Sequence, residues 1–186
     1  MVIFNPNIHH RRSIRLKGYD YSQSGLYFIT ICCQGKICYF GKIETCKMLL
    51  NDLGKITQQY WLEIPQHFPH AILHEYIIMP NHIHGIIELT GVGAKNVSPN
   101  PNSPKSCNIN NDSEAKNVSP LPRGTSQTIG SIIRGFKIGV TKQLGFSIWQ
   151  RNYYEHIIRN ETAYQNISNY IIHNPEKWHG DKFYIE

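Results

Sequence analysis

YIIMPNHIHGIIEL, the segment from Tyr76 to Leu89, carries the strongest structural signal in this chain. Two β-branched apolar runs flank a Pro-Asn turn, so we expect strands at 72–79 and 82–89 that pair as a hairpin. Side chains alternate along a strand, and His82 and His84 therefore point to one face. Two adjacent imidazoles can chelate a divalent metal, although the pair alone fits ordinary half-exposed strand histidines equally well.

The flanking sequence predicts further strands and helices. Residues 26–33, LYFITICC, predict a strand, and 37–43 predict its hairpin partner. Apolar residues at helical spacing predict a helix over 44–68 and a second over 125–144, with Thr125 or Ser126 as its cap. A third helix is predicted to begin at Asn160 or Thr162. It should end near His173 or Asn174, because Pro175 disfavours a helical residue before it. Residues 148–158, IWQRNYYEHII, predict an extended segment.

Residues 91–124 differ in composition from both flanks. They are rich in Asn, Ser, Pro and Gly, and they contain the hexapeptide AKNVSP twice, at 94–99 and 115–120. Such a composition cannot bury enough apolar surface to order itself, so it predicts a flexible linker. We therefore expect a basic N-terminal arm at 1–20 and one domain at 21–186 that this linker interrupts.

Composition limits the classes of function. The 186 residues carry a net charge of +6 with a pI near 9.1, which suits a polyanionic partner. No run approaches the ~20 apolar residues of a membrane span, and the first residues have no apolar signal core. The five cysteines are an odd number, which argues against a disulfide framework. We expect a cytoplasmic protein with no membrane association.

A second candidate group lies near the C-terminus. Tyr170 and Asn174 are four residues apart on the last predicted helix, so a phenol and an amide oxygen share one face. Attack by a tyrosine on a phosphate needs a deprotonated phenol, and a metal held by His82, His84 and Asn174 could polarise the phosphate and orient it for in-line attack. On the residues alone, Tyr170 is one of eleven tyrosines, and packing against the sheet is the more ordinary role.

Four blocks in order resemble one known family. They are PNHIHG, SIIRGFK, IWQRNYYEHIIRN and NYIIHNP, and they are similar to blocks of the REP-associated tyrosine transposases, which belong to the single-tyrosine branch of the HUH (histidine, hydrophobic, histidine) nucleases. The opening RRSIRLKGYDYSQSGLYFITICCQ also resembles that family, and the likeness spans about 11–90 and 125–179.

The resemblance implies a fold and a chemistry. The fold is an α+β domain, ferredoxin-like or RRM-like, in which helices flank an antiparallel sheet with the histidines on a central strand. His82 and His84 would bind a catalytic Mg²⁺ or Mn²⁺, with Asn174 on the metal side. Tyr170 would attack single-stranded DNA near a hairpin, form a 5′-phosphotyrosine link and release a 3′-hydroxyl. The protein would act as a monomer or a homodimer.

Basic and aromatic residues predict the DNA contacts. The cations are Arg11, Arg12, Arg15 and Lys17 of the arm, Arg134 and Lys137 of a helix, and Arg151 of the aromatic segment. Tyr153 and Tyr154 suit base stacking or core packing better than attack, although either remains an alternative nucleophile. His156 suits a structural role better than contact with metal or phosphate.

Two other functions fit parts of the sequence. One is a non-catalytic, RRM-like module that binds single-stranded nucleic acid. Convergence of Tyr170 with the histidine pair would separate the two, since a binding module has no need of it. The other is a zinc hydrolase built on His82 and His84, which lacks a third histidine or a glutamate general base at motif spacing.

Overall fold

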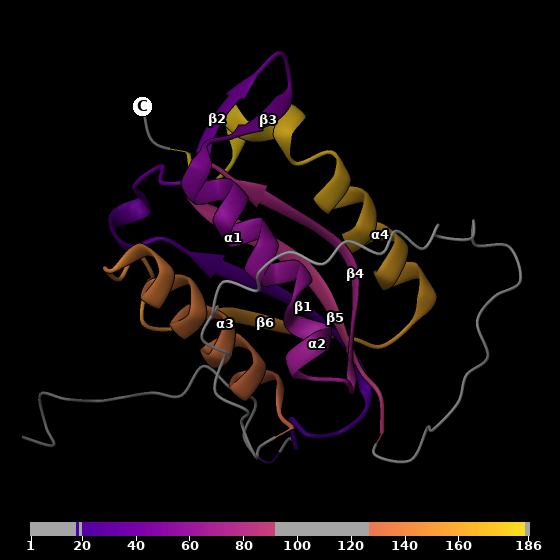
Figure 1. The fold of residues 1–186 in the computed structure, drawn as a ribbon. Coiled ribbons are helices and arrows are strands. Elements are labelled where there is room, and N and C mark those ends of the chain that lie inside the picture. The colour runs from indigo at the N-terminus through magenta and orange to yellow at the C-terminus, as the bar shows by residue number, and fades with distance from the viewer. Residues whose placement is uncertain (1–17, 19, 92–126, 185–186) are drawn as a thin grey trace, which may run out of the picture.

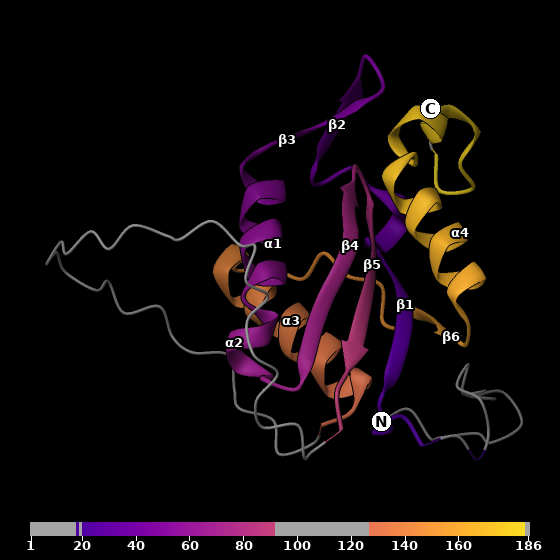
Figure 2. The same cartoon turned by 90° about the vertical axis from the view of Figure 1, so that its right-hand side faces the viewer.

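A four-stranded antiparallel sheet organises the computed structural model, which describes residues 18, 20–91 and 127–184. Its strands are β1 (Gly25–Cys32), β4 (Ala71–Met79), β5 (His82–Leu89) and β6 (Tyr154–Ile158), in the order β4-β5-β1-β6 (Figure 1). Helices α1 (Asp52–Leu62), α2 (Ile64–His67) and α3 (Ile129–Leu144) lie on one face, and α4 (Glu161–Ile172) lies on the other (Figure 2). The βαββαβ order with this strand arrangement is ferredoxin-like, as expected.

The central strand β5 is buried along almost its whole length. It pairs with β4 on one side and with β1 on the other, and helices cover both of its faces. Its odd-numbered residues Ile83 and Ile87 point toward α1 and α3, where they join the main core. Its even-numbered residues His82, His84 and Ile86 face the α4 side. The expectation of a histidine pair on a central strand is therefore confirmed.

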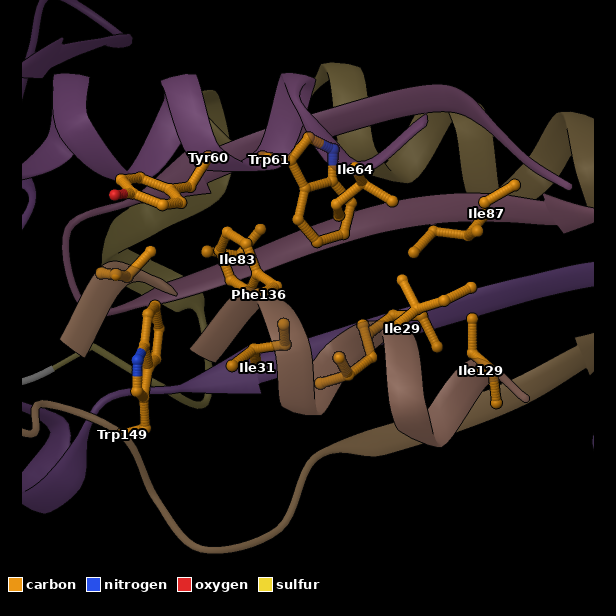
Figure 3. Packing of buried hydrophobic residues seen from close by; sticks show 14 of the residues in the cluster. Ile29, Ile31, Tyr60, Trp61, Ile64, Ile83, Ile87, Ile129, Phe136 and Trp149 are labelled. Atoms are coloured by element: carbon orange, nitrogen blue, oxygen red, sulfur yellow. The ribbon is translucent and has the colours of Figure 1, made fainter. Parts of the chain in front are cut away.

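The main core lies between the sheet and the α1–α3 layer. Ile29 and Ile31 of β1 meet Trp61 of α1 and Phe136 of α3 there, and all four are fully buried (Figure 3). The Trp61 and Phe136 rings meet edge to face, with their centroids 5.4 Å apart. Trp61 also lies against the backbone of Gly85, so that a Cβ at this position would overlap the indole ring.

Helix α4 is held to the other face by apolar and polar contacts. Ile171 packs with Ile86 and Ile158 in a second, smaller core. A register shift in β4 between Leu73 and Tyr76 accompanies polar contacts from that strand to α4. There Glu75 Oε2 accepts hydrogen bonds from Tyr164 Oη at 2.9 Å and Ser168 Oγ at 3.1 Å. These contacts fix α4, and hence Tyr170, relative to the sheet.

The predicted helix over 44–68 and the predicted strand partner at 37–43 are wrong in part. Strands β2 (Gly41–Glu44) and β3 (Lys47–Leu50) form their own two-stranded hairpin, which is not part of the main sheet. The turn between them places Thr45 and Cys46 at φ values of 47° and 59°, which end any helical pattern. Helix α1 begins only after Asn51, whose side chain accepts a hydrogen bond from Gly54 N.

The remaining boundaries differ less from expectation. Thr128 caps α3 by accepting from Ser131 N, whereas the predicted caps Thr125 and Ser126 lie outside the described residues. Asn160 caps α4, which ends at Ile172. Within 148–158 only β6 forms a regular strand.

The predictions of a basic arm and of a flexible linker concern parts of the chain that the structure does not describe. The arm up to Lys17 and the linker from 92 onward lie outside the described residues. Within the part of the chain that is described, no helix has the length and apolar character to cross a bilayer.

We expect Gly85→Ala to destabilise the protein by about 1–3 kcal/mol, because the new methyl group must displace the packed Trp61 ring. Urea denaturation followed by tryptophan fluorescence measures the change. Gly180→Ala is the matched control, since a Cβ at that position meets no atom within 4 Å. Equal stability of the two variants would contradict the packing argument.

Candidate active site

The two imidazoles of β5 lie side by side on the α4 face of the sheet. His82 Nε2 and His84 Nε2 are 3.1 Å apart, and both side chains are almost fully buried. The ring centroids are 4.5 Å apart, and the two ring planes meet at 71°. A strand that is covered on both faces thus presents two ring nitrogens to one point.

Neighbouring polar groups orient both rings. Asn81 donates through Nδ2 to the carbonyls of Lys36 and Phe183, each at 2.8 Å, which leaves its Oδ1 as an acceptor. His82 Nδ1 lies 2.9 Å from that oxygen and therefore donates to it, so His82 Nε2 carries a lone pair. His84 Nδ1 lies 2.9 Å from Thr30 Oγ1, which can likewise accept a hydrogen bond from Nδ1–H. Hydrogen-bond acceptors at Nδ1 hold histidines in the tautomer that binds metal through Nε2.

Burial keeps the histidine pair uncharged. It lowers the pKa of His82 to about 4, opposed by the Asp181 carboxylate and assisted by Lys182. Burial also lowers the pKa of His84 well below its usual range, and the neighbouring His82 and Lys182 act in the same direction. Neutral imidazole is the form that coordinates metal.

Tyr170 of α4 reaches the same point from the opposite side. Its Oη lies 3.1 Å from His84 Nε2, and its ring meets the His84 ring with centroids 5.2 Å apart. Burial raises the pKa of the phenol, and the Asp181 carboxylate raises it further, while a hydrogen bond from Asn174 lowers it. The hydroxyl is therefore protonated at neutral pH.

Oxygen ligands come from the segment that follows α4. Asp181 has a carboxylate oxygen within 4.8 Å of a ring nitrogen of both His82 and His84, so the three residues could hold a metal ion. Asn174 Nδ2 lies 3.5 Å from Asp181 Oδ2, and the Asn174 side chain is buried with no hydrogen-bond partner on its Oδ1. A buried, unsatisfied oxygen beside a histidine pair suits a cation. Two imidazoles with carboxylate and amide oxygens form a donor set that fits a divalent ion.

A cavity of about 520 Å³ opens beside these groups. Tyr170 and His84 line it, together with Thr30, Phe28 and Tyr154 of the sheet and with Asn174, Lys177, Gly180, Asp181 and Lys182 of the C-terminal segment. The cavity gives an external molecule access to the phenol, to His84 and to the oxygen ligands Asn174 and Asp181.

A second groove of about 480 Å³ lies on the α3 side of the sheet. It brings together Arg134, Lys137 and Arg151, which are three of the predicted DNA-contacting residues, and adds Lys142. Lys137 differs from the other three cations because its ammonium group is held by hydrogen bonds within the protein. Its Nζ donates to the carbonyls of Gln150 and Asn152 at 2.8 and 2.9 Å, and burial lowers its pKa to about 8. Lys137 thus connects α3 to the 150–152 segment, whereas Arg134, Lys142 and Arg151 are exposed.

The structure places the remaining predicted residues in different locations. Tyr153 lines the α3-side groove and packs against the main core, and Tyr154 lines the cavity. His156 is exposed and lies outside the His82–His84–Asp181 group. Arg11, Arg12, Arg15 and Lys17 lie outside the described residues. Sequence reasoning missed Asp181 because it lies in a polar tail with no motif spacing to the histidines.

Comparisons with known proteins identify two relatives and a structural neighbour. No family model matches the chain. An uncharacterized protein of Haemophilus influenzae is 49% identical over 98% of both chains. A second protein of that organism, named "Putative REP-associated tyrosine transposase", is 27% identical and aligns with 90% of this chain and 77% of its own length.

A solved structure shares the fold. It is that of a REP-associated tyrosine transposase bound to a REP hairpin, and it is 20% identical, with a TM-score of 0.56 over 91% of this chain and 75% of that one. The ordered sequence blocks, the curated relative and the shared fold agree, and the chain is similar in sequence and in fold to REP-associated tyrosine transposases.

Proposed function

We propose that the protein nicks and rejoins single-stranded DNA next to a hairpin, with Tyr170 as the nucleophile and a divalent ion held by the histidine pair. The observation that carries the proposal is the 3.1 Å contact between Tyr170 Oη and His84 Nε2, which in turn lies 3.1 Å from His82 Nε2. A tyrosine hydroxyl, two neutral imidazoles and a carboxylate lie together, and Tyr170, His84 and Asp181 line one cavity. A module that only binds nucleic acid has no need of this convergence.

In the proposed reaction, Tyr170 Oη forms a bond to phosphorus and the bond from phosphorus to the 3′ oxygen breaks. The phenol loses its proton to solvent, and the departing 3′ oxygen takes one up as it becomes a hydroxyl. The product is a 5′-phosphotyrosine, and attack by a 3′-hydroxyl reverses the step. Asn174 assists by donating to the phenolate, since its hydrogen bond lowers the pKa of the phenol.

His82, His84 and Asp181 would hold the ion, with the unsatisfied Asn174 Oδ1 as a further ligand. Bound there, Mn²⁺ or Mg²⁺ would polarise the scissile phosphate and favour the phenolate. Thr30 and Asn81 keep the Nε2 atoms available by accepting hydrogen bonds from the Nδ1–H groups.

Tyr170→Phe should abolish the covalent protein–DNA adduct while leaving DNA affinity nearly unchanged, because only the attacking oxygen is removed. Denaturing electrophoresis of protein incubated with labelled hairpin DNA and Mn²⁺ detects the adduct. Tyr39→Phe removes the hydroxyl of a tyrosine that does not line the cavity and should behave as wild type. An adduct that persists in Tyr170→Phe would assign the attack to another tyrosine, with Tyr154 the first candidate because it lines the same cavity.

Mn²⁺ affinity should stay nearly constant between pH 7.5 and 5.5, because the buried histidines remain neutral until the pH approaches the lowered pKa of His82. A pair of ordinary histidines would be about 90% protonated at pH 5.5 and would lose about a hundredfold in affinity. Calorimetric titration at several pH values measures this. A hundredfold loss would show that the pair titrates normally.

The same titration tests the ligand set. Asp181→Asn should weaken Mn²⁺ binding, while Asp52→Asn, an exposed carboxylate at the start of α1, should leave it unchanged. Equal effects of the two substitutions would remove Asp181 from the site.

We further propose that the hairpin stem docks on the groove formed by α3 and the 147–153 segment. The solved relative binds a REP hairpin, and this groove gathers the exposed cations Arg134, Lys142 and Arg151. Cations that contact phosphates release counterions and make binding dependent on salt.

Changing Arg134, Lys142 and Arg151 together to Gln should flatten the plot of log affinity against log salt by about 0.9 for each duplex phosphate that the variant no longer neutralises. Fluorescence anisotropy with a labelled hairpin gives the slope. The control changes Lys42, Lys47 and Lys55 to Gln, which removes the same charge from β2, β3 and α1. Equal slopes for the two triple variants would place the stem elsewhere.

A further inference from the structure

Tyr154 is exposed beside the candidate nucleophile. It begins β6, its side chain lines the active-site cavity, and 56% of its surface is accessible. An aromatic side chain that contributes so little to the core is available to a ligand.

A chain of ring contacts joins Tyr154 to the reacting groups through Phe28 of β1. The Phe28 ring centroid is 6.5 Å from that of Tyr154, 6.2 Å from that of Tyr170 and 5.3 Å from that of His84. Both of the first two pairs meet edge to face, and Phe28 stacks on His84. One ring therefore separates Tyr154 from the nucleophile.

Two positively charged side chains of the C-terminal segment also line the cavity. They belong to Lys177 and Lys182, and both are exposed. Gly180, between them in sequence, has no side chain, and a Cβ there would meet no atom within 4 Å, so there is open space beside it. A cavity of about 520 Å³ that is lined by an exposed aromatic ring and by two lysines suits a nucleotide.

We propose that Tyr154 stacks the base of a nucleotide adjacent to the scissile phosphate, while Lys177 and Lys182 contact the backbone of that strand. The inference rests on the proposed function, because it takes single-stranded DNA as the ligand of this cavity. Stacking tolerates any base, so Tyr154 positions the strand for attack and does not read its sequence. Tyr154 is thus a positioning residue that acts on the substrate.

The test uses an abasic scan of the DNA. Hairpin oligonucleotides with thymidine flanks, each carrying one abasic position, are titrated against Tyr170→Phe protein, which cannot cleave them. The same scan is run with Tyr154→Ala and with Tyr154→Phe added. Phe146→Ala is the control, an aromatic side chain of similar exposure that contacts Tyr39 and does not line the cavity.

We expect Tyr154→Ala to weaken binding of the intact DNA by about tenfold to a hundredfold, and Tyr154→Phe to restore affinity. Phe146→Ala should have no effect. At one flank position, loss of the base should weaken binding by the Tyr154 protein but not by the Tyr154→Ala protein. If every abasic position weakens both proteins equally, or if Tyr154→Ala binds like its parent, no base stacks on Tyr154.

This scan and the adduct assay fail independently. If wild-type protein forms the adduct but the scan shows no coupled position, the stacking inference is wrong and the nicking chemistry stands. If no adduct forms but one position is coupled to Tyr154, the cavity binds a nucleotide and the catalytic proposal is wrong.

Discussion

Burial of β5 on both faces is the constraint on which the site depends. A strand in the middle of a sheet that helices cover on both sides has few solvent-exposed positions, and polar side chains there need partners. Ile83 and Ile87 meet the main core, whereas Ile86 meets Ile171 of α4. The histidine end of the same face is closed by Tyr170 and by the segment around Asp181. The packing of α4 and of the segment around Asp181 on β5 thus both buries the strand and brings the site residues together.

Two buried imidazoles whose Nε2 atoms are 3.1 Å apart impose an electrostatic requirement. When both Nδ1 atoms are protonated, two lone pairs face each other, which is unfavourable unless a proton or a cation lies between them. Burial opposes the proton, because it lowers the pKa of His82 to about 4. A divalent ion would satisfy both lone pairs, the Asp181 carboxylate and the Asn174 oxygen together. The hydrogen bonds from the two Nδ1 atoms to Asn81 and Thr30 would therefore favour cation binding, because they make the cation-free pair with two facing lone pairs unfavourable.

The sequence indicated those parts of the site that follow from local periodicity. Alternation along 82–89 placed His82 and His84 together, and the i, i+4 relation linked Tyr170 to Asn174, although α4 ends at Ile172. Asp181 could not be found in this way, because tertiary packing brings it to the histidines. The ring centroid of Phe183, two residues further on, lies 4.5 Å from that of His82, and the Phe183 carbonyl accepts a hydrogen bond from Asn81.

The hairpin of β2 and β3 was missed for a related reason. Met48, Leu49 and Leu50 continue an apolar pattern that also fits a helix, and the turn at Thr45 and Cys46 decides between the two.

The cavity and the α3-side groove lie on opposite faces of the sheet, yet adjacent residues connect them. Arg151 and Tyr153 line the groove, and Tyr154 lines the cavity, because β6 begins at Tyr154 and its side chains alternate between faces. Strand β6 is also one of the two edge strands of the sheet. A nucleic acid whose duplex occupies the groove and whose single strand enters the cavity must therefore pass around this edge. Its path is short only if the duplex ends near Arg151. The position of the stem would then set which phosphate reaches Tyr170, so that hairpin geometry, rather than base readout, would select the site of attack.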